Sequence, residues 1–464
     1  MEKLTQTFKE VTLEIQKQIL KEHSHKTIQA KENIFYKMRS KTLVDIYRGA
    51  CEINRLIVFD VEGVLIPKRR YLLFEAARRV GHWNTFKLIV IGLLYEAWML
   101  PLESAFKRIF ILFQGIAIDD LFQLYKQVPL IPSVEEVFKK LKQAGYRTAL
   151  ISSGLPTLFV EHLAARLGAD YAFGLQLETT DNRFTGKISG DVIKHNGKAL
   201  VLKKIIERER VSPQDCVVVA DDRNNLSMFP LCAVRIGYNP DFLVSAKCDF
   251  VVKGALSESL PYLTGEITKT YNPGLSRSDF IREAIHISGV FVPFVCMYLK
   301  DDRYLVFSLI FIVTLLYIAS ELVRLRGTNI PVFSTLTWRA AIKPELYEFI
   351  TAPIIYAIAI MVSLILFSPP INYASIAILA LGDGFATLFG KKFGRTTFLF
   401  NKGKQVEGSF FGFLFAFMGA RAFVNPTQAF IASAIGMLME SLPTPVSDNL
   451  TVPIVSGLVL TVIS

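Results

Sequence analysis

Two carboxylates at the end of an apolar run are the first residues in the chain whose type and spacing suggest chemistry. Residues 56–59 are Leu-Ile-Val-Phe, and Asp60, Val61, Glu62 and Gly63 follow directly. A continuous apolar run predicts a strand that is buried on both faces, as in a parallel sheet. Side chains alternate along an extended backbone, so Asp60 and Glu62 point to the same side. The stretch predicts two carboxylates facing one phosphate or metal ion, and the plainer alternative is a strand that ends in a polar turn.

Three further polar groups follow predicted strands or open a predicted helix. Ser152-Ser153-Gly154 comes after a strand over residues 146–151, where a hydroxyl and backbone amides can hold phosphate oxygens. Lys198 opens a helix over 199–207, a position that is usually a solvated surface charge. A strand over 216–220 runs into a second acidic cluster, Asp221-Asp222-Arg223-Asn224-Asn225. None of these signals is specific by itself, but their order along the chain is.

Taken in order, the motifs Asp-x-Glu-Gly, Ser-Ser-Gly, Gly-Lys and Asp-Asp-x-Asn-Asn resemble those of the haloacid dehalogenase-like (HAD) phosphohydrolases. The resemblance is to the phosphoserine phosphatase-like branch, in which a helical cap separates the first two motifs. It covers roughly residues 54–255 and implies a Rossmann-like α/β domain with a cap over about 68–130.

The resemblance also implies a role for each motif. Asp60 attacks phosphorus and forms an aspartyl-phosphate, and Glu62 protonates the leaving oxygen and then activates water. Ser152 hydrogen-bonds the transferring phosphoryl group, while Lys198 neutralises charge on Asp60 and the phosphate. Asp221 holds Mg²⁺ together with Asp60 and the backbone carbonyl of Glu62.

The chain departs from the family at two of these positions. Glu62 stands where the family usually has aspartate, and its extra methylene moves the acid. Asn225 stands where a second acid is frequent, with Asp222 nearby in reserve. Either change could slow catalysis or alter the accepted leaving group, so a catalytically weak regulatory domain is an alternative. Glu75 would fit a cap carboxylate that recognises the amine of phosphoserine, whereas the apolar helix predicted over 86–100 favours a lipid-like substrate.

Composition divides the 464 residues into two unlike halves. We predict an N-terminal helical arm (1–52), the HAD domain (53–255), a linker (256–278) and a helical membrane domain (279–464) with about seven spans. The formal charge of +11 comes with no aromatic and basic nucleic-acid module, and much of it flanks apolar stretches. The five cysteines show no metal or disulfide spacing, which fits a reducing compartment, and no signal peptide follows Met1.

The loop charges of the second half predict its topology. The predicted spans cover residues 280–299, 303–323, 347–368, 371–390, 406–424, 427–441 and 448–464. The loops after the second and the fourth predicted span carry most of the lysine and arginine found between spans. Both loops should therefore face the cytosol, on the same side as a cytosolic HAD domain. The chain would then be an integral protein of the cell membrane with its HAD domain in the cytosol. The polar residues near the span ends fall on that same side: Arg282, His286, Glu321, Arg324, Asp383, Lys404, Glu407, Glu440, Asp448 and Asn449.

This constellation is similar to the phytol kinase, dolichol kinase and CTP-dependent diacylglycerol kinase family. The motifs that carry the similarity are Arg282-x-x-x-His286, Gly382-Asp383-Gly384, Lys404-x-x-Glu407-Gly408-Ser409, Glu440-Ser441 and Asp448-Asn449. The resemblance implies a lipid-alcohol kinase that uses a nucleoside triphosphate, commonly CTP. One departure is Arg282-Glu283, where the family has an Arg-Lys pair.

The predicted kinase site needs positioning and charge neutralisation more than covalent chemistry. Gly382 and Gly384 allow backbone approach to phosphates, and Asp383 is placed to carry Mg²⁺. The Lys-x-x-Glu-Gly motif, with Glu407 and Gly408, belongs to the predicted nucleotide site, which basic side chains complete: Lys391, Lys392 and Lys404. The acid that deprotonates the alcohol stays open among Asp383, Glu407, Glu440 and Asp448.

The sequence thus predicts a bifunctional membrane enzyme, a CTP-dependent kinase of an isoprenoid alcohol (polyprenol, dolichol or phytol-like) joined to a Mg²⁺-dependent phosphatase. Its expected partners are a lipid alcohol or lipid phosphate, a nucleoside triphosphate and a membrane, and no nucleic acid. The alternatives are a phosphoserine-type or weak regulatory HAD domain, and a cytidylyltransferase-like membrane domain.

Overall fold

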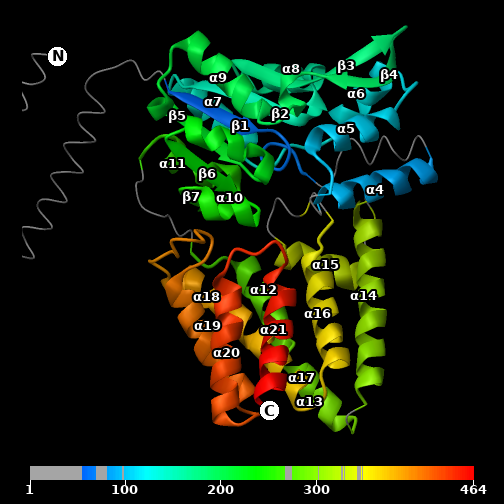
Figure 1. The fold of residues 1–464 in the computed structure, drawn as a ribbon, viewed down its shortest axis with the longest axis vertical. Helices are drawn as coiled ribbons and strands as arrows, with labels where there is room; N and C mark the ends of the chain where they lie inside the picture. Colours follow the sequence, from blue (N-terminus) through cyan, green and yellow to red (C-terminus); the bar gives the residue numbers. More distant parts are fainter. Residues whose placement is uncertain are drawn as a thin grey trace, which may run out of the picture. The chain divides into compact units, whose positions relative to one another are not determined.

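The computed structural model describes residues 55–68, 81–96, 99–266, 274–300, 302–325, 328, 330–341, 346 and 349–464. The predicted N-terminal arm and Glu75 lie outside the described residues. An α/β domain comes first and a set of mostly apolar helices follows it (Figure 1).

A seven-stranded sheet forms the centre of the α/β domain. The strands are β1 (Leu56–Asp60), β2 (Arg147–Pro156), β3 (Tyr171–Thr180), β4 (Arg183–Ser189), β5 (Cys216–Ala220), β6 (Val234–Tyr238) and β7 (Phe250–Val252). Their order is β4-β3-β2-β1-β5-β6-β7, and every pair is parallel except β3 with β4. Strand β1 lies between β2 and β5 and is parallel to both. The carboxyl ends of these three strands, where Asp60, Ser152 and Asp221 were predicted to act, therefore meet at one edge of the sheet. The predicted Rossmann-like parallel sheet is confirmed.

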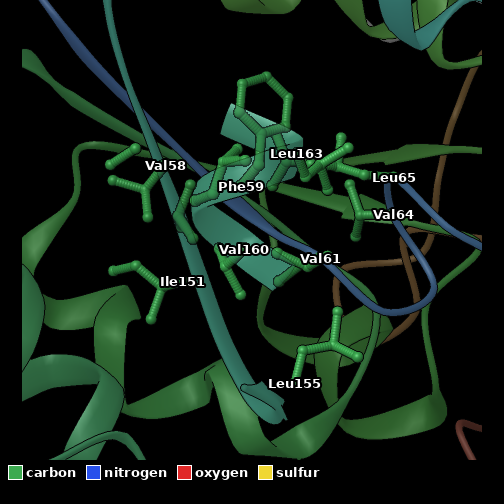
Figure 2. Packing of buried hydrophobic residues seen from close by; sticks show 14 of the residues in the cluster. Val58, Phe59, Val61, Val64, Leu65, Ile151, Leu155, Val160 and Leu163 are labelled. Atoms are coloured by element: carbon green, nitrogen blue, oxygen red, sulfur yellow. The ribbon is translucent and has the colours of Figure 1, made fainter. Parts of the chain in front are cut away.

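The core of this domain is built on β1. Leu56 through Phe59 are fully buried, as an apolar strand in the middle of a parallel sheet must be. Phe59 packs on Phe138 with ring centroids 4.8 Å apart, and Figure 2 shows β1 side chains beside Val160 and Leu163. Dense packing on both faces leaves the strand little freedom, so the position of Asp60 at its end is fixed.

Helices connect and cover the strands. They are α4 (His82–Glu96), α5 (Leu102–Ile111), α6 (Ile118–Lys126), α7 (Val134–Gln143), α8 (Thr157–Leu167), α9 (Gly197–Glu209), α10 (Phe242–Lys247) and α11 (Leu260–Leu263), with short 3₁₀ segments at Asp191–Ile193, Pro213–Asp215, Arg223–Leu231 and Leu256–Ser259. Helices α4 to α6 fall within the predicted cap. Leu256 and Leu263 are fully buried in the same core, so the fold continues past residue 255.

Three element boundaries differ from the sequence-based predictions. The apolar helix predicted over 86–100 is α4, which ends at Glu96. Strand β2 continues through Ser152-Ser153-Gly154, where the sequence predicted that it had ended. Two segments that the sequence marks as turn and hairpin material, 168–173 and 185–187, lie largely within two strands, β3 and β4. Boundaries shift because β2 and β3 pair beyond the apolar stretch that marks them in the sequence.

The second half of the chain is helical. Its helices are α12 (Arg277–Ser288), α13 (Phe291–Tyr298), α14 (Arg303–Leu325), α15 (Pro331–Ala340), α16 (Ala352–Leu366), α17 (Ile371–Ala377), the π-helical segment η6 (Ile378–Asp383), α18 (Gly384–Phe393), α19 (Val406–Ala420), α20 (Pro426–Ser441) and α21 (Asp448–Ile463). Helices α18 to α21 lie side by side, each against the next (Figure 1).

Among the described residues, three helical stretches are long and apolar enough to cross a membrane: Arg277–Tyr298, Arg303–Leu325 and Ile371–Phe393. The third is mostly buried inside the bundle, whereas the first two expose most of their apolar surface. Shorter apolar helices are Ala352–Leu366, Val406–Ala420 and Asp448–Ile463. The number of spans and their topology stay predictions.

Candidate functional sites

Asp60 is held at the end of β1 by two side chains from other segments and by the backbone N–H of the next residue. Lys198, in the first turn of α9, donates a hydrogen bond to Asp60 Oδ1 over 2.7 Å. Asn225 donates its side-chain N–H to Asp60 Oδ2 and accepts from Lys198 Nζ at 2.8 Å. The Val61 backbone N–H also donates to Asp60 Oδ1, over 2.8 Å. All three side chains are buried, so the carboxylate is oriented and electrostatically stabilised on both of its oxygens.

Lys198 is therefore no surface charge. It is 3 % exposed, and burial by itself lowers the pKa of its ammonium. The carboxylates of Asp60, Asp222 and Glu62 outweigh this effect, so the pKa is raised and Lys198 stays charged. A fixed cation beside Asp60 is what a carboxylate that approaches an anionic phosphate requires.

Asp60, Asp221 and Asp222 form a cluster whose carboxylate oxygens lie within 4.8 Å of one another. Asp221 Oδ1 is buried and has no hydrogen-bond partner among the described residues. Lys68 places its ammonium 2.8 Å from Asp221 Oδ2 and 2.7 Å from Asp222 Oδ2. An all-oxygen donor set with an unsatisfied buried oxygen suits a hard cation, so these residues fit Mg²⁺.

Glu62 lies in a tight space between the strand ends. Burial, together with the nearby Asp60 carboxylate, raises the pKa of Glu62 to about 7, against the opposing effects of Lys198 and Ser152. A Cβ on Gly154 would lie 2.4 Å from Glu62 Oε1, so only glycine leaves room for this longer acid. A carboxyl group with a pKa near 7 can both give and take a proton at neutral pH.

Glycine and serine at the neighbouring strand ends shape the same space. A Cβ on Gly63, whose φ is +84°, would fall 2.2 Å from Asp221 Oδ2. Ser152 is fully buried, and its Oγ accepts from the Leu155 backbone N–H over 2.8 Å. The structure thus brings together the predicted α/β site residues Asp60, Glu62, Ser152, Lys198 and Asp221.

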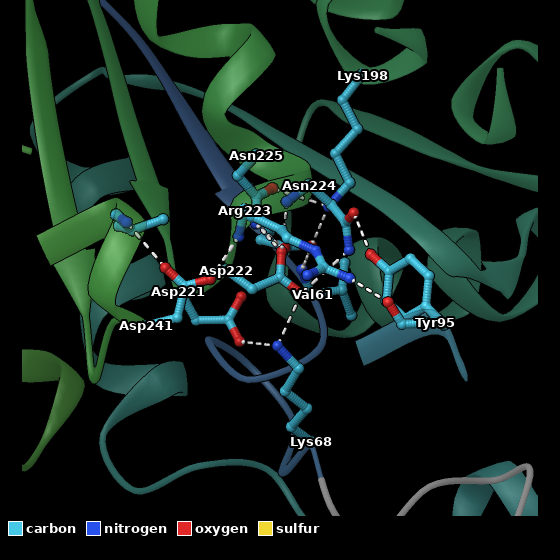
Figure 3. A network of polar contacts seen from close by, with 12 residues as sticks. Val61, Lys68, Tyr95, Lys198, Asp221, Asp222, Arg223, Asn224, Asn225 and Asp241 are labelled. Carbon is cyan, nitrogen blue, oxygen red and sulfur yellow. Dashed lines mark hydrogen bonds and ion pairs between the residues drawn. The ribbon is translucent and has the colours of Figure 1, made fainter. Parts of the chain in front are cut away.

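A polar network links this site to cap helix α4 (Figure 3). Arg223 Nη2 donates to the Tyr95 backbone carbonyl over 2.6 Å, and its guanidinium lies 4.5 Å from the centre of the Tyr95 ring. The Tyr95 hydroxyl in turn donates to Asn224 Oδ1. Helix α4 is therefore attached to the loop that carries Asp221 and Asp222.

The sequence motifs mark Asp222 only as a reserve acid, and they do not mark two other residues of this site, Lys68 and Tyr95. The acidic run itself pointed to Asp222. We find no sequence signal that would have placed Lys68 or Tyr95 at this site.

A second acidic cluster lies in the helical bundle. Carboxylate oxygens of Asp383, Glu440 and Asp448 lie within 4.8 Å of one another. Lys404 donates to Glu440 Oε1 and, over 2.7 Å, to Asp448 Oδ2, and it lies 4.0 Å from Asp383 Oδ1. Asp383 ends the π-helical segment η6, a kind of irregularity that is frequent at functional sites.

Two further predicted polar residues join this cluster from other helices. His286 Nε2 lies 3.4 Å from an oxygen of Asp383 and 2.6 Å from Asn449 Oδ1. Ser409 Oγ donates to Glu440 Oε2 over 3.1 Å. The donor chemistry again suits a divalent cation, with Lys404 as a fixed positive charge beside it.

The other residues predicted for the bundle site have different contacts. Glu407 accepts from the Thr396 backbone N–H, and Lys391 donates to Asp279 over 2.6 Å. Lys392 lies 5.2 Å from the ring centre of Phe393. Added Cβ atoms would press on neighbouring helices at three glycines: Gly382, Gly384 and Gly408. These glycines permit close helix packing, and their role toward phosphates stays a prediction.

Known proteins resemble the α/β domain. A profile of haloacid dehalogenase-like hydrolases matches residues 57–229. The chain is 31% identical over 189 residues to a phosphoserine phosphatase of Archaeoglobus fulgidus. The matched region covers 40% of this chain and 53% of that protein. It is 30% identical over 211 residues to a phosphoserine phosphatase of Methanocaldococcus jannaschii, covering 45% of this chain and 98% of that protein.

A solved phospho-aspartyl intermediate analogue of phosphoserine phosphatase is 28% identical, with 45% of this chain and 99% of that chain covered and a TM-score of 0.41. The chain spans about half the length of the Archaeoglobus relative and nearly all of the Methanocaldococcus one. The predicted phosphoserine phosphatase-like HAD domain is confirmed. The profile match ends before the bundle, so the resemblance of the bundle to lipid kinases stays a prediction.

Proposed function

This chain belongs, through residues 57–229, to the haloacid dehalogenase-like hydrolase family, and on that premise we propose that its α/β domain is a Mg²⁺-dependent phosphomonoesterase with Asp60 as nucleophile. The observation that carries the proposal is the orientation of Asp60. Lys198 and Asn225 fix both of its oxygens beside Asp221 and Asp222.

The reaction proceeds through two displacements at phosphorus. An Asp60 oxygen attacks and forms an aspartyl-phosphate, while the ester oxygen leaves with the proton of Glu62. The Glu62 carboxylate then takes a proton from water, which attacks the aspartyl-phosphate and releases inorganic phosphate. Lys198 and the Ser152 hydroxyl offset the charge on the phosphoryl oxygens throughout.

Asp60, Asp221 and Asp222 would hold Mg²⁺, which neutralises phosphate charge when it is bound. Removing the metal with EDTA should therefore abolish phosphate release, and re-adding Mg²⁺ should restore it.

Two substrate classes compete for this site, a phosphoserine-type soluble monoester and a lipid phosphate. The relatives named phosphoserine phosphatase support the first. The exposed apolar side chains of α4 support the second. Phosphate release from phosphoserine and from polyprenyl phosphate, measured on the full chain in detergent with Mg²⁺, separates the two. Release from neither substrate nor from a generic aryl phosphate would favour a weak regulatory domain instead.

We further propose that the bundle is a CTP-dependent kinase of an isoprenoid alcohol. The cluster of Asp383, Glu440 and Asp448 around Lys404 supports a Mg²⁺-nucleotide site next to apolar helices. Ionisable groups among apolar helices are costly to bury, and this favours a functional reason for their convergence.

Incubating the full chain with labelled CTP and polyprenol tests the kinase and its alternative together. Transfer of the γ-phosphoryl group would give polyprenyl phosphate. Replacing polyprenol by a lipid phosphate tests the alternative, because transfer of the cytidylyl group to that phosphate with release of pyrophosphate would identify a cytidylyltransferase-like enzyme.

A further inference from the structure

Helix α4 exposes an apolar face although its other face is buried. Trp83, Phe86 and Val90 share one side of the helix at spacings of three and four residues and are 68%, 55% and 37% exposed. On the other side, Leu88 is buried in the core and Ile91 packs against it. A helix that is apolar on both sides normally has both covered, so the outer side requires an occupant.

The chemistry of the outer face matches a bilayer interface. The Trp83 and Phe86 rings stack with centroids 5.6 Å apart, and the Lys87 ammonium lies 5.8 Å from the Trp83 ring centre. Tryptophan is enriched at the level of lipid headgroups, and exposed lysine beside such rings suits anionic lipids.

The chain itself keeps this face near a membrane. Only thirteen residues separate Leu263, at the end of α11, from Arg277, where the first stretch long and apolar enough to span a bilayer begins. Such a segment reaches at most about 50 Å when fully extended. If that stretch is inserted, the end of α11 stays within this distance of the bilayer, so the α/β domain stays close to the membrane.

We propose that Trp83, Phe86 and Val90 insert into the interface of the bilayer that holds the bundle, and that α4 thereby gives the Asp60 site access to phosphomonoesters carried by lipids. The inference rests on the proposed phosphatase function and selects its substrate class. Tyr95 of α4 contacts Asn224 and Arg223, so this helix is also attached to the loop that carries Asp221 and Asp222, and the contact does not involve Trp83, Phe86 or Val90.

Tryptophan fluorescence tests insertion directly, because the chain has only three tryptophans. Trp98→Phe with Trp338→Phe leaves Trp83 as the sole emitter in the full chain, reconstituted in phosphatidylcholine–phosphatidylglycerol vesicles. We expect blue-shifted emission that lipids brominated in their acyl chains quench and that acrylamide does not. In the control, all three tryptophans become Phe and Leu158→Trp, at an exposed position of helix α8, supplies the emitter. Its emission should show the opposite pattern.

Trp83 emission that only acrylamide quenches would overturn the proposal. Emission shielded from both quenchers would also overturn it, since a second copy or the chain's own helices would then cover the face. Neither outcome depends on phosphatase activity, so the failure of this inference and the failure of the proposed function can be told apart.

A kinetic comparison tests the consequence for substrate choice. Trp83→Ser with Phe86→Ser should lower kcat/KM for polyprenyl phosphate in vesicles by about tenfold or more, because two apolar contacts with lipid are lost. Hydrolysis of p-nitrophenyl phosphate by the same variant should stay unchanged. Equal loss on both substrates, or no loss on either, would contradict the inference.

Discussion

The residues that the structure describes include two clusters of three carboxylates, and one lysine beside each cluster, Lys198 or Lys404, contacts the acids in a different way. In the α/β domain, Lys198 and Asn225 fix one carboxylate, that of Asp60, on both of its oxygens. In the bundle, Lys404 is shared among three acids that come from separate segments. The contacts of Lys198 and Asn225 orient one acid, Asp60, as a nucleophile requires. Lys404 instead shares its positive charge among three acids. The difference suits covalent hydrolysis in one cluster and direct phosphoryl transfer between bound substrates in the other.

The largest expected effect follows from replacing Asp60, the acid that is fixed on both of its oxygens. Asp60→Asn should lower phosphate release on the order of 10⁴-fold or more, since loss of a nucleophile is not compensated by its neighbours. CTP-dependent lipid phosphorylation by the same protein should be unaffected. Glu136→Gln, an exposed acid on α7, is the matched control and should leave both rates unchanged. Intact phosphatase activity in Asp60→Asn would contradict the assignment.

The bundle cluster should respond in the converse way. Asp383→Asn should lower lipid phosphorylation by about 10²–10³-fold, since a charge that holds the metal and nucleotide is lost, and should leave phosphatase activity intact. Glu407→Gln sharpens this test, because Glu407 contacts the Thr396 backbone instead of the acid cluster. A small effect of Glu407→Gln beside a large effect of Asp383→Asn is expected. The reverse order would show that the cluster is not the kinase site.

A smaller effect is expected where Gly154 makes room for Glu62. Gly154→Ala places a methyl group in the space of the Glu62 carboxylate, so kcat for phosphate release should fall about tenfold through a misplaced acid. Adding Glu62→Asp in the same chain shortens the acid and should recover part of the loss. No recovery in the double variant would mean that Gly154 serves another purpose.

The smallest expected effect concerns the amide that fixes Asp60. Asn225→Asp removes donors to Asp60 and Asp222 and adds a buried charge, so the metal-free chain should lose about 1–3 kcal/mol of stability. Mg²⁺ should restore most of the unfolding temperature. Asn182→Asp, which removes an exposed donor to Asp119, should show no such Mg²⁺ dependence. Equal responses to Mg²⁺ in the two variants would rule out metal binding by the new carboxylate as the cause.

Much of the α/β site could be predicted because sheet geometry determines where the motif residues meet. Asp60, Ser152 and Asp221 lie on three adjacent strands or at their ends, and parallel pairing brings such groups to one edge. Lys198 was predicted from motif order alone, since a lysine at a helix start is usually solvated. What motif order could not supply was its burial, which depends on packing.

The remaining site residues are set by local geometry that leaves no periodic signal. In a continuing strand, the side chain of Asp222 would point to the opposite side from that of Asp221. The strand ends before these residues, however, and Asp222 is the N-cap of the following 3₁₀ segment. Lys68 lies in a loop after β1 and Tyr95 in the cap helix α4, and neither is marked by a motif. In the bundle, the common depth of the polar residues predicts that Asp383, Lys404, Glu440 and Asp448 converge. The motif places Glu407 with them, but Glu407 lies in the first turn of α19 and accepts a hydrogen bond from the Thr396 backbone N–H.

Trapping the covalent intermediate tests the central claim most directly. The full chain is incubated with Mg²⁺ and a hydrolysable phosphomonoester, quenched, and reduced with borohydride, which converts an acyl-phosphate to an alcohol. Peptide mass spectrometry should find homoserine at residue 60, only when substrate is present and never in Asp60→Asn. Sustained phosphate release with Asp60 unmodified, or with the modification on an acid of the bundle, would contradict the assignment of the α/β domain as an aspartate-nucleophile phosphatase.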